Sequence, residues 1–141
     1  MLRRAITANQ ARVNGDPRNP LAWLNLGEAH FLLGDSAAAV AAWEKAQSLG
    51  LAPRALWYIF WPAIAYNRLG QPQRVIALTQ TAIAQQPASP ELLLEQGLAY
   101  IALGDRAKGR QALTQALVYA PQVYSPPIER ARRALAELGP G

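Results

Sequence analysis

Apolar residues in this chain recur at spacings of three and four, the period of an amphipathic α-helix. Glycine, proline and capping residues interrupt the pattern at short intervals and mark where one helix ends and the next begins. The pattern predicts an all-helical chain whose short connections place sequential helices antiparallel. The predicted helices cover residues 2–14, 20–33, 36–49, 54–69, 72–85, 90–103, 106–119 and 126–138.

The interruptions recur with a nearly constant period. Leu-Gly pairs stand at Leu33-Gly34, Leu69-Gly70 and Leu103-Gly104, which are 36 and then 34 residues apart. Pro87 and Pro121 mark the other joint, again 34 residues apart. Self-similarity with this period is typical of an array of stacked helix pairs.

Residues with short polar side chains precede most of the predicted helices. Such side chains accept hydrogen bonds from the free backbone N–H groups of a first helical turn, and a proline in that turn has no N–H group to lose. The expected N-caps are Asn19, Asp35, Ser89, Asp105 and Ser125.

The helix pairs resemble the tetratricopeptide repeat family. The family's first helix, helix A, carries the pattern W-x2-L-G-x2-Y. The first pair matches it at Trp23, Leu26, Gly27 and His30; the third keeps Leu93, Gly97 and Tyr100 but has Gln96 for leucine; the second keeps Ala63 and Tyr66. The second helix, helix B, matches at Ala39, Trp43 and Ala46, at Val75, Thr79 and Ala82, and at Gly109, Leu113 and Ala116.

This resemblance implies an all-α fold, a right-handed α-solenoid of antiparallel helix pairs with about eight helices in one domain, residues 1–141. Small residues would let helices A and B approach closely, and large ones would fill the spaces between them. The expected parts are a lone N-terminal helix (2–16), three repeats (20–53, 54–87 and 88–121) and a C-terminal capping helix (125–138).

The family also implies that the A helices line a concave groove. The stripes expected to face it are Leu21, Leu24, Glu28 and Phe31; Trp57, Phe60, Trp61, Ile64 and Arg68; and Glu91, Leu94, Leu98 and Ile101. A helix that is apolar nearly all round is normally covered. The cover is an apolar peptide, helix or domain of a partner, or the chain's own end helix, or a second copy in a homodimer, or packing between repeats.

The partner-contacting residues predicted within these stripes are Leu24, Glu28, Phe31, Trp57, Phe60, Trp61, Ile64, Arg68, Leu94, Leu98 and Ile101. Aromatic residues are favoured hot spots, so Trp57, Phe60 and Trp61 are the foremost contacts, with core filling around Pro62 as their alternative role. We expect no clamp for a chaperone's C-terminal carboxylate. The matching clamp positions hold Leu24, Glu28, Trp61, Glu91 and Glu95, whose acids repel a carboxylate.

Composition changes this picture little. The chain has no cysteine and one histidine, His30, which occupies an aromatic position of the repeat. Glu91 and Glu95 lie one turn apart without further ligands, so we expect no catalytic site, no metal and no cofactor. The formal charge of +5 comes from scattered arginines, which argues against a nucleic-acid partner. The apolar run from Leu56 to Tyr66 is too short for the roughly 20 residues of a membrane span.

The function expected from the sequence is therefore a non-catalytic scaffold for protein–protein interaction. Residues 49–66 also resemble the tetratricopeptide tail of bacterial papain-like cysteine peptidases of the bacteriocin-processing type. This resemblance implies an alternative, an accessory or self-assembly tail of a longer enzyme. The sequence names neither partner nor oligomeric state. The cytoplasm is the default compartment for the chain as given, and an extracytoplasmic one is open if it is a fragment of a secreted protein.

Overall fold

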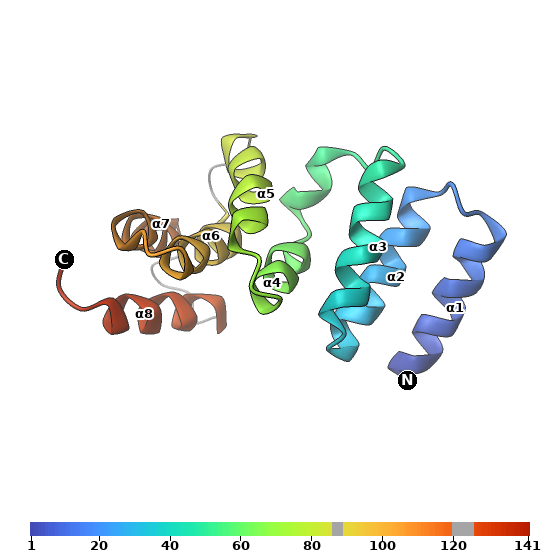
Figure 1. Cartoon of the computed structure of the whole chain (residues 1–141), viewed down its shortest axis with the longest axis horizontal. Helices are drawn as coiled ribbons and strands as arrows, with labels where there is room; N and C mark the ends of the chain where they lie inside the picture. Colours follow the sequence, from blue (N-terminus) through green and yellow to red (C-terminus); the bar gives the residue numbers. More distant parts are fainter. Residues whose placement is uncertain (86–88, 120–125) are drawn as a thin grey trace. The chain divides into compact units, whose positions relative to one another are not determined.

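The computed structural model describes residues 1–85, 89–119 and 126–141. Within this part of the chain it contains eight α-helices, one 3-10 helix (η1) and no strand (Figure 1). Their bounds are α1 Leu2–Gly15, α2 Pro20–Leu33, α3 Ser36–Ser48, η1 Pro53–Trp57, α4 Trp61–Arg68, α5 Pro72–Gln85, α6 Pro90–Ala102, α7 Arg106–Tyr119 and α8 Pro126–Leu138. The all-α prediction is confirmed, and seven of the eight predicted helices lie within one residue of their observed bounds at either end.

Local sequence explains where these helices begin. Four predicted caps accept backbone hydrogen bonds: Asn19 from Leu21 and Ala22, Asp35 from Ala38, Ser89 from Leu92, and Asp105 from Lys108. The backbone N–H of Lys108, followed by its ammonium group, lowers the pKa of the Asp105 carboxyl. The fifth predicted cap, Ser125, and the predicted joint residues Pro87 and Pro121 lie outside the described residues.

The predicted continuous helix over 54–69 is wrong. The chain forms η1, then leaves helical structure at Tyr58, and begins again with α4 at Trp61. Pro62 lies in the first turn of α4, where its missing N–H group costs nothing. In a continuous helix the same proline would forfeit a hydrogen bond to Tyr58 and clash with the preceding turn, so the helix restarts there instead. The stripe from Trp57 to Arg68 therefore does not lie on one straight helix.

The chain divides into two compact units, unit 1 from Met1 to Leu69 and unit 2 from Gly70 to Gly141. The boundary falls inside the predicted second repeat, residues 54–87, between its two helices. Each unit has a buried apolar cluster of its own. The single domain over 1–141, the bounds of the repeats and the right-handed sense of the solenoid stay predictions.

In unit 1, α1, α2 and α3 lie side by side and alternate in direction (Figure 1). The lone helix α1 packs on α2 through Val13, which joins Ala22 and Leu26 in a buried cluster. Trp23 packs against this cluster, and its indole N–H donates to the carbonyl of Pro17 at 2.9 Å. The tryptophan of the helix-A pattern thus ties the connection before α2 to the core.

Helices α2 and α3 approach closely at two residues with little or no side chain, Gly27 and Ala39. A Cβ atom at Gly27 would lie 3.1 Å from the carbonyl oxygen of Ala39, which is fully buried. The same Cβ would lie 2.7 Å from the ring of Trp61 on α4. The missing side chain at Gly27 therefore allows two close contacts. One is between the backbones of α2 and α3, and the other is with the Trp61 ring of α4. The phenol of Tyr66 adds a hydrogen bond from α4 to Glu44 of α3, at 3.0 Å.

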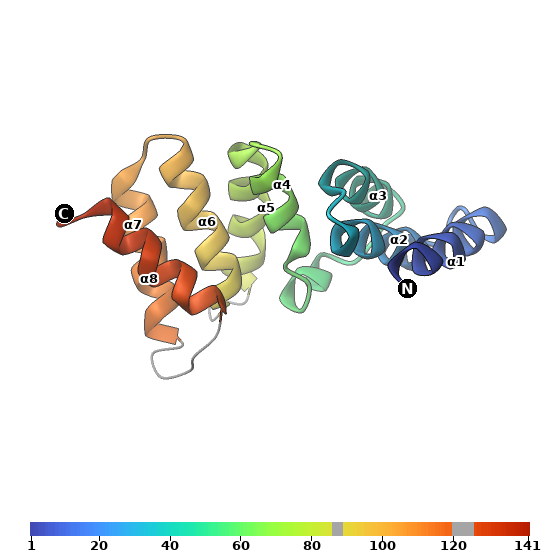
Figure 2. The same ribbon diagram turned by 90° about the horizontal axis from the view of Figure 1, so that it is seen from below.

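Unit 2 repeats this construction. Helix α6 packs on α5 and on α7, and α8 packs on both α6 and α7 (Figure 2). A Cβ atom at Gly97 of α6 would lie 2.8 Å from the side chain of Leu113 and 3.1 Å from the carbonyl oxygen of Gly109. Facing glycines therefore set the separation of α6 and α7, and the fully buried Leu113 fills the space beside them.

Replacement of Gly27 by alanine tests the close approach. Gly27→Ala is expected to lower the free energy of unfolding by about 1–3 kcal/mol, because the new methyl group overpacks the contact with Trp61 and Ala39. Gly15→Ala is the matched control, since nothing lies within 4 Å of its Cβ position in α1. Urea unfolding followed by circular dichroism measures both. Equal effects of the two substitutions would contradict the assignment.

Candidate partner-binding surface

The predicted groove residues of unit 1 fall into two groups. Leu24 and Trp61 are buried, with 7% and 6% of their surface exposed, and cannot meet a partner without rearrangement. The other six are half-buried or exposed: Glu28, Phe31, Trp57, Phe60, Ile64 and Arg68. We call these six the unit 1 face. They come from α2, from η1 and from α4 with its N-cap.

Trp61 forms the joint between helices. Its ring stacks on Phe31 with centroids 5.8 Å apart and meets Trp43 edge-on at 5.9 Å. Offset and edge-to-face arrangements are those that aromatic pairs prefer. Of the two roles considered for Trp61, the structure shows core filling. The indole nitrogens of Trp43, Trp57 and Trp61 are buried without an acceptor among the described residues.

Arg68 lies over the outer side of this aromatic cluster. Its guanidinium carbon is 4.7 Å from the centroid of the Phe31 ring, a cation–π distance. Four side chains thus run in sequence from the surface into the core: Arg68, Phe31, Trp61 and Trp43. Sequence analysis placed Arg68 and Phe31 on groove stripes but could not predict this contact, which joins two helices.

Several large apolar side chains of unit 1 are exposed, among them Tyr58 and Leu21. Tyr58, in the break between η1 and α4, is 78% exposed, and Leu21 in the first turn of α2 is 58% exposed. Tyr58 was not among the predicted contacts. Pro62 could have indicated the exposure of Tyr58. A proline favours the first turn of a new helix, so the residues just before that helix lie in a loop.

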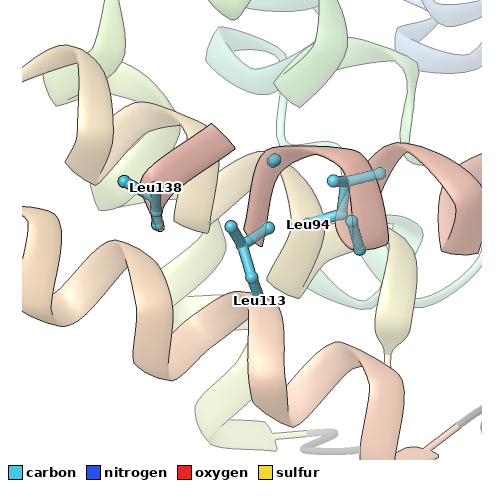
Figure 3. Packing of buried hydrophobic residues seen from close by; sticks show 5 residues of the cluster. Leu94, Leu113 and Leu138 are labelled. Atoms are coloured by element: carbon cyan, nitrogen blue, oxygen red, sulfur yellow. The ribbon is translucent and has the colours of Figure 1, made fainter. Parts of the chain in front are cut away.

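The groove stripe of unit 2 is covered by the chain itself. Leu94 is 1% exposed in a cluster with Leu113 of α7 and with Ala131, Ala134 and Leu138 of α8 (Figure 3). Leu98 and Ile101 pack against the same cluster. For this stripe the structure shows the alternative in which the chain's own end helix is the cover. Leu94 can contact a partner only if α8 moves away, whereas Leu98 and Ile101 remain half-buried.

Polar contacts hold α8 in place at both of its ends. Near its beginning, the Arg130 guanidinium donates to the Glu95 carboxylate of α6 at 2.9 Å. Glu95 has only 2% of its side chain exposed, whereas Arg130 has 47%. At the other end, Arg106 donates to the carbonyl of Leu138 at 2.6 Å and Arg110 to that of Gly139. The predicted capping helix is therefore fastened by charged side chains as well as by its apolar face.

Two departures from the repeat pattern compensate each other in unit 2. Gln96 stands where leucine is expected in helix A, and Thr79 stands where an aromatic is expected in helix B. The Gln96 amide donates to the Thr79 hydroxyl at 3.2 Å, and that hydroxyl donates to the carbonyl of Val75. A polar pair joins α5 and α6 where the pattern would place apolar packing, so the buried hydroxyl is satisfied.

Metal binding needs acidic or histidine side chains that lie close together. Among the described residues, no group of three or more histidine, aspartate or glutamate side chains could hold a metal ion. His30 is partly buried, with its Nδ1 atom 3.9 Å from the Asp35 carboxylate, at the end of α2. Within the same part of the chain, no helix is both long and apolar enough to cross a lipid bilayer.

Family comparison identifies the repeat. Two tetratricopeptide repeat models match the chain, one over residues 21–49 and the other over residues 91–122. These segments contain α2 with α3, and α6 with α7. The chain is a tetratricopeptide repeat protein. Its sequential helices pack in pairs as in the solenoids of that family, as the sequence predicted. No curated protein matches the chain in sequence.

Solved structures agree on the fold. MamA 41-end from Desulfovibrio magneticus RS-1 matches with a TM-score of 0.83 at 19% identity, over 97% of this chain and 73% of that one. TTC0263, a thermophilic TPR protein in Thermus thermophilus, matches with 0.69 at 25% identity, over 97% and 72%. The first TPR of Spaghetti (RPAP3), bound to an HSP90 peptide, matches with 0.70 at 18% identity, over 87% and 92%.

Removal of the Arg130 side chain tests whether its ion pair with Glu95 stabilises the packing of α8 on α6. Arg130→Ala is expected to lower the free energy of unfolding by about 1–3 kcal/mol, because it deprives the buried Glu95 carboxylate of its charged donor. The control is Arg133→Ala on the same helix, an exposed position that should change stability by less than about 0.5 kcal/mol. Denaturant unfolding compares the two. Indistinguishable stabilities would contradict a structural role for the pair.

Proposed function

We propose that this tetratricopeptide repeat protein is a non-catalytic scaffold that binds an apolar segment of another protein through the unit 1 face. The observation that supports the proposal is the difference between the two units. In unit 2, α8 buries Leu94, and the half-buried Leu98 and Ile101 are aliphatic side chains packed against the same cluster. In unit 1, aromatic and aliphatic side chains of the A helices remain half-buried, namely Phe31, Trp57, Phe60 and Ile64.

The chemistry of the face suits a protein segment. Large side chains that are already partly fixed by packing lose little conformational freedom on binding, and aromatic residues dominate binding energies at interfaces. Tyr58 and Leu21, from the same elements or the loop that joins them, are more exposed apolar side chains of unit 1. Glu28 and Arg68 supply opposite charges that can orient the bound segment.

Structures with the same fold give this function a precedent. The first TPR of Spaghetti (RPAP3) is described as bound to the HSP90 peptide SRMEEVD, and YrrB as a TPR protein with an unusual peptide-binding site. We propose that the present chain does not use the chaperone-tail clamp. Of the matching positions, Leu24, Trp61 and Glu95 are buried, and the Glu95 carboxylate is already paired with Arg130.

Two alternatives remain. The unit 1 face could bind a second copy of the chain, or the chain could be the accessory or self-assembly tail of a longer bacterial enzyme such as a cysteine peptidase. Neither has a specific contact in its favour. Light scattering during size-exclusion chromatography separates the first alternative, since a stable dimer at micromolar concentration would favour a second copy.

Substitution at the face tests the proposal. Random 12-residue peptides displayed on phage are selected on the whole chain, and enriched peptides are synthesised and titrated. Trp57→Ala is expected to weaken their binding about tenfold or more, because it removes a large anchoring side chain. Tyr58→Ala, at a position too exposed to affect folding, should weaken it severalfold.

The matched control is Val118→Ser, which changes an apolar side chain that is 66% exposed on α7. It should leave peptide binding unchanged. Far-UV circular dichroism and the unfolding midpoint establish that each variant is folded. Peptides that bind both unit 1 variants as tightly as they bind the wild type would show that the face is not the binding site.

A further inference from the structure

The guanidinium of Arg68 is the starting point of a further inference. It is exposed on α4 and lies on the Phe31 ring, at 4.7 Å from the centroid. Among the described residues, no carboxylate forms an ion pair with it, although the chain pairs the guanidinium groups of Arg130 and Arg132 with glutamates. The unit 1 face therefore contains a fixed cation, Arg68, that has no anionic partner within the part of the chain that the structure describes.

The contact with Phe31 prepares this cation for binding. Stacking restricts the long arginine side chain, so part of the entropy that a mobile side chain would lose is already lost. The edge of a stacked guanidinium still presents parallel N–H donors, which match the two oxygens of a carboxylate. Phe31 is held in turn by its stack on the buried Trp61, so the support reaches the core of unit 1.

We propose that the partner of the unit 1 face is a peptide segment carrying an aspartate or glutamate next to its apolar side chains, and that Arg68 binds that carboxylate. The inference rests on the proposed function and adds the chemistry of the partner to it. Charge complementarity carries the inference, since the face offers a guanidinium without an ion pair among the described residues, beside half-buried apolar side chains such as Ile64.

The negative charge of Glu28 limits which partners the unit 1 face can bind. It lies on the same helix as Phe31, one turn earlier, and is exposed. Its carboxylate disfavours a long polyanion across the face but leaves room for a single acid at Arg68. A peptide with one acidic residue beside apolar residues therefore fits better than a nucleic-acid backbone, whose charges repeat along its length.

Selection from the same random 12-residue phage library tests the inference, with wild type and variants of the whole chain as bait. Wild type should enrich aspartate or glutamate next to aromatic or aliphatic residues. Arg68→Gln should lose the acidic enrichment while it keeps the apolar one. A synthetic peptide selected on wild type should bind Arg68→Gln about tenfold more weakly, and its Glu→Gln version should bind wild type and Arg68→Gln equally.

Two controls separate a specific contact from a general loss of charge. Arg12→Gln removes the same charge from an exposed site on α1 and should leave binding of the acidic peptide unchanged. Arg68→Lys keeps the charge but not the planar stack, and should recover only part of the affinity. An Arg12→Gln effect as large as that of Arg68→Gln would overturn the inference.

The remaining outcomes distinguish this inference from the proposed function. Enrichment of apolar peptides without an acidic residue would overturn the role of Arg68 and leave the scaffold function standing. No enrichment by any bait would contradict both. Binding of a 12-nucleotide single-stranded DNA that Arg68→Gln abolishes, in place of peptide binding, would assign the arginine to a nucleic acid.

Discussion

The close approach of neighbouring helices at residues without bulk is the constraint on which this structure depends. At Gly27 the backbone of α2 comes near the carbonyl of Ala39 on α3. The ring of Trp61 packs into the space that a side chain at position 27 would occupy. Facing Gly97 and Gly109 set the same approach in unit 2. A helix pair cannot bury its apolar faces alone, and at Gly27 the same lack of a side chain also gives space to the next helix, α4.

The function proposed for the chain follows from what covers the A helices after this packing is complete. In unit 2, α8 lies over Leu94 and is tied to the buried Glu95 through Arg130. In unit 1, Phe31 stacks on Trp61 and stays half-buried, with the guanidinium of Arg68 over its ring. The same repeat chemistry thus produces one stripe that an end helix largely covers and one with half-buried aromatic side chains, which we propose as the binding surface.

Sequence reasoning succeeded where the determinants were local. Caps such as Asn19 and Asp35 and small residues such as Gly27 specify helix bounds and close contacts through their own chemistry. It failed at residues 54–69, where the effect of Pro62 on the preceding turn outweighed a continuous apolar pattern. It left open whether the end helix covers the stripe of α6. It could not predict that Gln96 pairs with Thr79 or that Arg68 stacks on Phe31, because each contact depends on tertiary geometry.

The coupling between position 27 and the indole of Trp61 tests the central constraint most directly. The measurement is a double-mutant cycle of unfolding free energies, in which alanine replaces Gly27 in the wild type and in a Trp61→Leu background. We expect the added methyl group to cost at least about 1 kcal/mol less when the indole is absent, because the 2.7 Å contact is then relieved. An equal cost in both backgrounds would contradict the constraint.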